Sequence, residues 1–171
     1  MNYKPSEARH FSTLGRRLKR VMTEKGLTVA AAESLTGGTI ASMIAQIPGS
    51  SAYFKGSVTS YAVSVKEEVL GVDVSIGGVV SESTARQMAE GVARVMRSDC
   101  AVATTGIAGP GGAEPGKPVG TVCIAATCHG QTVARTYHFK GGREAVILQS
   151  ADAALELLIT FLQENTKLQG Q

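Results

Sequence analysis

Apolar positions along this chain follow two spacings. Apolar residues every three or four positions are typical of helices packed by one face, and short continuous apolar runs are typical of buried strands. Helical spacing covers residues 6–25, 36–46, 61–70, 81–96 and 143–163, and strand-like runs cover 27–32, 52–59, 99–104, 119–127 and 132–139. Helices thus alternate with strands until a late hairpin, which predicts a three-layer α/β/α domain with a mixed β-sheet.

A few residues are suited to begin or end these elements. Gly26 follows the first helix as a C-cap glycine would, and Ser81 is a favourable N-cap. Thr36 is expected to cap the second helix, which places Gly37 and Gly38 in its first turn. The helix after Ser81 is expected to bury one apolar face, formed by Ala85, Met88, Ala89, Val92, Val95 and Met96.

Composition places the chain among globular proteins. Its 171 residues are 43% hydrophobic and 18% charged, which fits one domain (1–171) with a core from about residue 10 to 163. The formal net charge is only +3, and the basic residues form no stripe, so we expect no nucleic-acid partner. No apolar run reaches membrane-spanning length and the N-terminus lacks a signal-like core, so we expect a cytoplasmic protein with no membrane partner.

The cysteines and histidines indicate neither a disulfide framework nor a metal site. Cys100, Cys123 and Cys128 are odd in number and lack a C-x-x-C spacing. Cys100 and Cys123 sit in apolar runs and are expected to act as small buried hydrophobic residues. The histidines are scattered, so no metal is expected.

A loop rich in glycine and proline covers residues 105–120. It holds six of the 20 glycines and three of the five prolines, between two strand-like runs. Glycine lets a backbone approach a ligand closely and proline stiffens the unbound loop, so this loop suits a pre-shaped binding wall at the end of a strand. A turn-rich connector is the alternative. Thr105, at its start, could contact a polar ligand or simply begin a turn.

Ser34 and Lys66 are the main candidates for chemistry. Ser34 falls at a strand end beside a helix N-terminus, whose N–H groups can stabilise an oxyanion or a phosphate. A serine nucleophile needs a base, and a desolvated Lys66 could serve, with Tyr61 relaying the proton. The alternatives are that Ser34 caps the helix and that Lys66 is a surface residue beside Glu67 and Glu68.

Several motifs occur together and in a fixed order. They are Glu-Ser-Leu-Thr-Gly-Gly at 33–38, Pro-Gly-Ser-Ser at 48–51, a Phe-x-Gly-x-Val-x-x-Tyr-x4-Lys stretch at 54–66, Val-Ser-Glu at 80–82, Thr-Gly-Ile-Ala-Gly-Pro-Gly-Gly at 105–112 and Lys-Pro-Val-Gly-Thr at 117–121. Together they resemble the CinA C-terminal family over roughly residues 10–160, with the segment at 105–110 the most specific. The molybdopterin-binding-like domain of full-length CinA proteins is not in this sequence, which resembles the stand-alone form.

The resemblance implies a nicotinamide-nucleotide amidase, which hydrolyses nicotinamide mononucleotide to nicotinic acid mononucleotide and ammonia in pyridine nucleotide salvage. It implies Ser34 as nucleophile, Lys66 as general base and Tyr61 as its assistant. No metal or organic cofactor is expected. The protein is expected to form a homodimer or a higher homo-oligomer. The substrate-binding positions expected from the same motifs are Thr36, Gly37, Gly38, Ser51, Thr105, Gly106 and Arg143.

Three positions depart from the family pattern. Val63 stands where members often have Asn, Leu35 where they often have Cys, and Ile147 where many have a second arginine after the one matching Arg143. If that arginine binds phosphate, Arg143 is left as the anchor. A catalytically weak nucleotide-binding paralogue, acting as a sensor or accessory subunit, is therefore a second hypothesis. A competence factor associated with DNA is a third, against which the modest charge argues.

Overall fold

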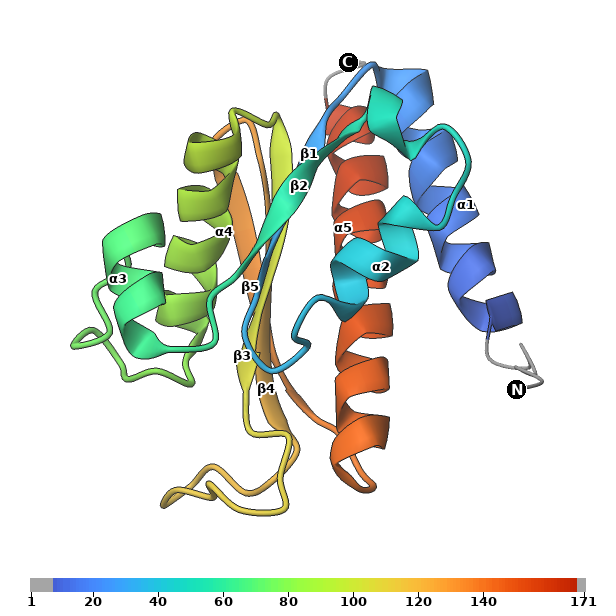
Figure 1. Ribbon diagram of the computed structural model, residues 1–171. Helices are drawn as coiled ribbons and strands as arrows, with labels where there is room; N and C mark the ends of the chain where they lie inside the picture. Colours follow the sequence, from blue (N-terminus) through green and yellow to red (C-terminus); the bar gives the residue numbers. More distant parts are fainter. Residues whose placement is uncertain (1–7, 169–171) are drawn as a thin grey trace.

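The computed structural model describes residues 8–168 as three layers, with a five-stranded sheet between two layers of helices (Figure 1). The elements in chain order are α1 (Ala8–Lys25), β1 (Val29–Glu33), α2 (Thr39–Ala45), the short 3-10 helix η1 (Ser50–Ala52), β2 (Phe54–Thr59), α3 (Val63–Leu70), α4 (Glu82–Met96), β3 (Cys100–Gly106), β4 (Thr121–Cys128), β5 (Gln131–His138) and α5 (Arg143–Leu168). The predicted α/β/α class is confirmed.

The sheet is mixed, with strand order β2-β1-β3-β4-β5. β1 runs parallel to both β2 and β3, whereas the β3–β4 and β4–β5 pairs are antiparallel. Parallel neighbours end at the same edge, so the carboxyl ends of β1, β2 and β3 meet there. The β4–β5 hairpin turns through His129 and Gly130, whose φ angles of 49° and 79° are those of a tight turn matched to strand twist.

Both faces of the sheet are buried, which explains the continuous apolar runs of its central strands. Helices α1, α2 and α5 cover one face, and α3 and α4 lie on the other (Figure 1). Along β1, Val29 and Ala31 belong to the first core, and Ala30 and Ala32 to the second. Among the described helices, α5 alone is long and apolar enough to cross a membrane by length and composition, and 56% of that window is buried inside the domain, as in a core helix.

The helices differ from the expectation at the start of α2, on the outer face of α4 and at the end of α5, and α3 begins at Val63 rather than at residue 61. Thr36 does not cap α2, because Gly37 and Gly38 take φ angles of 56° and 106° and delay the helix to Thr39. Val95 is 44% exposed, beyond the buried face of α4. α5 continues past Gln163 to Leu168, since no glycine or proline interrupts that stretch.

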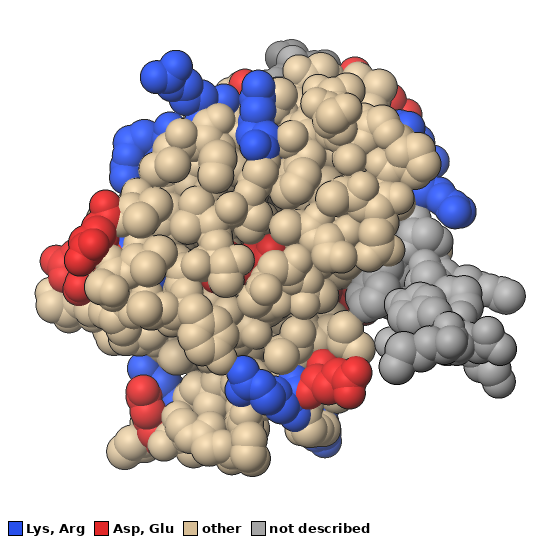
Figure 2. Space-filling view, viewed as in Figure 1, with Lys and Arg blue, Asp and Glu red and all other residues tan. Residues whose placement is uncertain are grey.

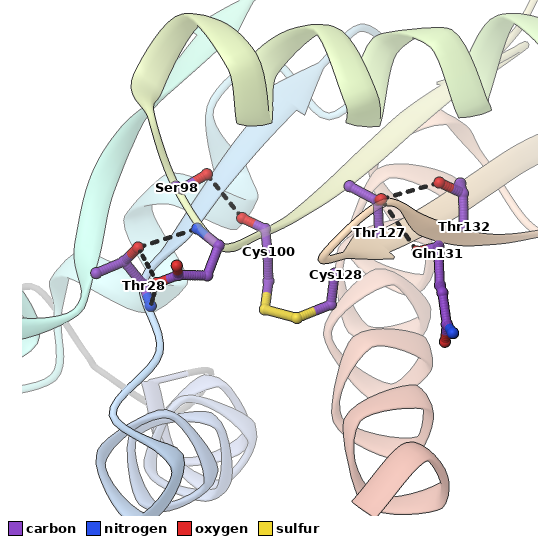
Figure 3. Close-up of a disulfide and its surroundings, with 8 residues drawn as sticks. Thr28, Ser98, Cys100, Thr127, Cys128, Gln131 and Thr132 are labelled. Carbon is purple, nitrogen blue, oxygen red and sulfur yellow. Dashed lines mark hydrogen bonds between the residues drawn. A yellow bond between two sulfur atoms is a disulfide. The ribbon is translucent and has the colours of Figure 1, made fainter. Parts of the chain in front are cut away.

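The structure also corrects the reading of the cysteines. Cys100 and Cys128 form a disulfide between β3 and β4, and only Cys123 is free, buried as expected (Figure 3). The two bonded residues are 28 positions apart, but the antiparallel register places them opposite each other with Cα atoms 4.1 Å apart. Sequence spacing could not show this, because the pairing depends on strand register.

The disulfide lies at the edge of the sheet where β1 and β3 begin. Beside it, the Asp99 carboxylate accepts hydrogen bonds from Thr28 N–H at 2.8 Å and from the Thr28 hydroxyl at 2.7 Å. Ser98 donates to the Cys100 carbonyl at 2.8 Å (Figure 3). These contacts bind the starts of β1 and β3 together, at the end of both strands away from Ser34.

Candidate active site

The candidate site lies where β1, β2 and β3 end, at the lower edge of the sheet in Figure 1. Ser34 directly follows β1, Lys66 is on α3 after β2, and Thr105 and Gly106 close β3. A cavity of about 380 Å³ joins these residues, walled by the glycine- and proline-rich loop and by Arg143 at the start of α5. The fold thus gathers segments that are far apart in the sequence.

Ser34 and Lys66 are in direct contact. The Lys66 side-chain nitrogen Nζ lies 3.0 Å from Ser34 Oγ, and the lysine is only 1% exposed. Burial lowers the pKa of Lys66, because a low-dielectric surrounding disfavours the charged form. The interpretation of Lys66 as a surface residue is therefore wrong, since α3 turns it inward and leaves Glu67 and Glu68 exposed.

The other contacts of Lys66 are with main-chain carbonyls. Its Nζ also donates to the carbonyl of Ser60 and to the carbonyl of Tyr61, the latter at 3.4 Å. A neutral amine has two N–H donors and one lone pair; if the two carbonyls take the donors, the lone pair faces the Ser34 hydroxyl. No carboxylate within residues 8–168 forms an ion pair with Lys66. A neutral Lys66 amine can therefore take the proton of the Ser34 hydroxyl onto its nitrogen.

The N-terminus of α2 does not serve the site as expected. Its N–H groups are occupied by Glu33, whose carboxylate accepts from Gly38, Ile40 and Ala41 at 2.8–3.0 Å. The helix dipole that could hold an oxyanion or phosphate is therefore already neutralised. Sequence reasoning missed Glu33, and the available signal was an acidic residue shortly before two glycines and a helix.

Arg143 and Tyr61 meet at the mouth of the cavity. The Arg143 guanidinium donates to the Tyr61 hydroxyl at 2.6 Å and to the Gly109 carbonyl at 2.8 Å. The Tyr61 residue is 59% exposed, and its hydroxyl points to Arg143, so only its main-chain carbonyl contacts Lys66. The side chain thus lines the cavity, and its hydroxyl is not in contact with Lys66, where the expected proton relay would need it.

Thr105 and Gly106 line the cavity as expected. The Thr105 hydroxyl donates to the Val79 carbonyl at 2.8 Å and so ties β3 to the segment before α4. A side chain at Gly106 would lie 2.7 Å from the Thr121 carbonyl, which explains the glycine there.

Four predicted substrate-binding residues lie off this cavity. Thr36 is buried with its hydroxyl 2.9 Å from that of Thr104, and neither Gly37 nor Gly38 lines the cavity. Ser51 belongs to η1, before β2 begins, and therefore lies at the opposite edge of the sheet (Figure 1). Within one chain these residues support or lie far from the site.

Charge and metal-binding groups are sparse. In the view of Figure 2 most of the surface is uncharged, and the Lys and Arg side chains lie apart along its edges rather than in a stripe. Over the described residues, no group of three or more His, Cys, Asp or Glu side chains could hold a metal ion.

The fold and the site define an α/β/α domain with a buried serine–lysine pair at the carboxyl edge of its parallel strands. Residues 12–162 match the family model of the CinA C-terminal domain, so the chain belongs to that family. It is 45% identical over 154 residues to a CinA-like protein of Syntrophus aciditrophicus, covering 88% of this chain and 37% of that protein. It is 43% identical over 145 residues to a putative competence-damage inducible protein of Desulforudis audaxviator, covering 83% and 35%. The chain therefore spans little more than a third of these curated relatives.

Solved structures agree over nearly whole chains. The competence/damage inducible protein CihA from Agrobacterium tumefaciens superposes with a TM-score of 0.86 at 38% identity, covering 95% of this chain and 99% of that one. A CinA superfamily protein from Klebsiella pneumoniae gives 0.86 at 30% identity, covering 90% and 98%.

Proposed function

We propose that this protein is a nicotinamide-nucleotide amidase that hydrolyses nicotinamide mononucleotide to nicotinic acid mononucleotide and ammonia. The observation that carries the proposal is the contact between Ser34 Oγ and Lys66 Nζ, 3.0 Å apart inside a cavity. An activated serine beside a buried amine suits attack on a carboxamide carbon. The substrate is inferred from the family resemblance, since the cavity alone specifies only a small polar molecule.

The mechanism has two stages. Ser34 Oγ attacks the carboxamide carbon while the neutral Lys66 amine takes the hydroxyl proton; Lys66 then gives that proton to the leaving nitrogen, and ammonia departs as the C–N bond breaks. Water next attacks the acyl-enzyme and Lys66 accepts a proton from it; Lys66 then returns this proton to Ser34 Oγ as the Ser34–carbon bond breaks, which releases the acid and restores the neutral amine. This dyad uses an amine where the Ser-His-Asp arrangement uses imidazole.

Main-chain N–H groups are the proposed oxyanion donors. Leu35 and Ala108 both line the cavity and are only 4% and 5% exposed. Neither N–H finds an acceptor within the described part of the chain. Buried N–H groups are rarely left unpaired, so a ligand oxygen is a suitable partner for both.

Arg143 is the proposed anchor for the substrate phosphate. It lies at the cavity mouth, and a planar guanidinium binds phosphate oxygens in pairs. Ile147, where many relatives have a second arginine, packs against the hydrophobic core and cannot contribute. With one arginine instead of two, this protein should bind the nucleotide more weakly than relatives that have the second arginine, and Ser34 and Lys66 should be unaffected.

The proposal is tested by ammonia release from the purified protein. We expect ammonia and nicotinic acid mononucleotide in equal amounts, and at least about tenfold lower kcat/KM for nicotinamide riboside, which lacks the phosphate and its charge-assisted hydrogen bonds. A wild-type protein that binds the nucleotide without releasing ammonia would contradict the amidase proposal and support the nucleotide-binding paralogue.

The pH dependence of the reaction should report Lys66. Burial lowers its pKa, and only the neutral amine can act as the base, so kcat/KM should rise about tenfold per pH unit up to that lowered pKa and then level off. The unfolded chain has the higher pKa and binds the proton, so stability should also rise with pH between the lowered pKa and the ordinary one. A stability that falls with pH in this window, in thermal unfolding of wild type against Lys66→Met, would contradict the assignment.

A further inference from the structure

We propose that Glu33 is a positioning residue, whose buried carboxylate fixes the segment that carries Ser34 relative to Lys66. The inference deepens the proposed function and rests on it for the enzymatic consequence. Glu33 touches neither the cavity nor the reacting atoms, so its effect must pass through Ser34 and through the segment before α3.

The Glu33 side chain binds β1 to α2 and β2. The residue is fully buried, and its Oε2 accepts from Gly38 N–H and Ile40 N–H, both at 3.0 Å. Its Oε1 accepts from Ala41 N–H at 2.8 Å and from the Ser57 hydroxyl at 3.3 Å. Gly38, the N-cap of this short helix, offers no side-chain cap of its own, so Glu33 supplies it from five residues upstream.

The Glu33 main chain binds the segment that leads to Lys66. Its carbonyl accepts from Ser60 N–H at 2.8 Å, and the Ser60 carbonyl in turn accepts from Lys66 Nζ. Ser34, the next residue, donates its N–H to the Thr104 carbonyl at 3.0 Å. Glu33 therefore links three parts of the site: the nucleophile Ser34, the helix α2 that follows it, and Ser60, whose carbonyl accepts from Lys66.

Only a carboxylate fits these four donors. Both carboxylate oxygens accept hydrogen bonds, and no cation within residues 8–168 forms an ion pair with Glu33. The carboxylate is therefore stabilised by the N–H groups and by the α2 dipole. In Glu33→Gln the amide NH₂ would replace one acceptor with two donors facing N–H groups. We expect the start of α2 to move, and Ser34 with it.

The experiment compares wild type with Glu33→Gln in two assays. Ammonia release from nicotinamide mononucleotide should show kcat about 100-fold lower with KM within about threefold, because small displacements of a reacting group cost rate rather than binding. Phenylmethanesulfonyl fluoride should label Ser34 more slowly by a similar factor, measured by mass spectrometry. In that reaction the Ser34 Oγ–sulfur bond forms, fluoride leaves, and Lys66 takes the proton, so labelling reads the dyad without the natural substrate.

Asp99→Asn is the matched control. Asp99 also clamps main-chain and hydroxyl groups with its carboxylate, but at the far ends of β1 and β3. It should lower the melting temperature and leave kcat and labelling unchanged. Equal loss of kcat and labelling in both variants, or Glu33→Gln with wild-type labelling, would overturn the proposal.

Two further outcomes remain decisive. If wild type is labelled at Ser34 but releases no ammonia, the amidase function fails while the labelling ratio still judges Glu33. If wild type is labelled no faster than Ser34→Ala, the dyad is unreactive and the positioning role falls with it.

Should Glu33→Gln not fold, Glu33→Asp keeps the charge but is one methylene short; it should retain the fold with about tenfold lower kcat, and wild-type kcat in it would overturn the proposal.

Discussion

Lys66→Met is expected to abolish ammonia release and leave the domain close to wild-type stability. The rate should fall by about 10³-fold or more, because the base is lost while the serine and the cavity remain. Methionine fills the space of the buried lysine stem, and removing the amine relieves its desolvation. The Ser60 and Tyr61 carbonyls lose a donor in exchange. The opposing effects are similar in size, so the free energy of unfolding should change by no more than about 1 kcal/mol.

The rate of ammonia release should fall by a similar factor in Ser34→Ala. The double variant, Ser34→Ala with Lys66→Met, should be no slower than either single variant. Two groups that act in one step lose their joint contribution when either is removed. Lys55→Met, at an exposed position on β2, is the control and should keep full activity. Multiplicative losses in the double variant, or a Lys66→Met enzyme above a tenth of the wild-type rate, would contradict the dyad.

Among the variants proposed for this protein, Gly120→Ala should lose the most stability. Gly120 ends the glycine- and proline-rich loop with φ of 92°, and an added Cβ would lie only 2.0 Å from the Phe139 carbonyl oxygen. Its N–H donates to the Ile107 carbonyl at 2.8 Å, and its carbonyl accepts from Phe139 N–H at 2.9 Å, so the backbone cannot simply move away. We expect a loss of about 3 kcal/mol or more in the free energy of unfolding by urea denaturation.

Gly116→Ala separates the two causes of that loss. Gly116 is in the same loop with φ of 75°, but a Cβ there would meet nothing within 4 Å. It should therefore show only the strain of the left-handed backbone, about 1 kcal/mol. Equal losses in the two variants would mean that steric contact at Gly120 contributes nothing.

Several features followed from local patterns. The alternation of helices and apolar runs was enough for the three-layer α/β/α class, and the residues Gly26 and Ser81 marked element ends that the structure confirms. These predictions succeed because backbone preference and burial of one face act over a few neighbouring residues. The position of Ser34 at a strand end came from the same evidence.

Other features depend on strand register and on packing between distant segments. The Cys100–Cys128 bond needs the antiparallel pairing of β3 and β4, which no cysteine spacing reveals. The inward turn of Lys66, the Arg143–Tyr61 contact and the place of Ser51 at the opposite edge likewise depend on how α3, α5 and β2 pack.

The local pattern of this chain therefore determines its elements, its class and the strand end that holds the serine. Only the folded chain decides which lysine is desolvated, which N–H groups Glu33 occupies and which remain for a ligand. The physical reason is range: backbone propensity acts between neighbours along the chain, whereas burial, pKa and hydrogen-bond partners are set by residues brought together from anywhere in the sequence.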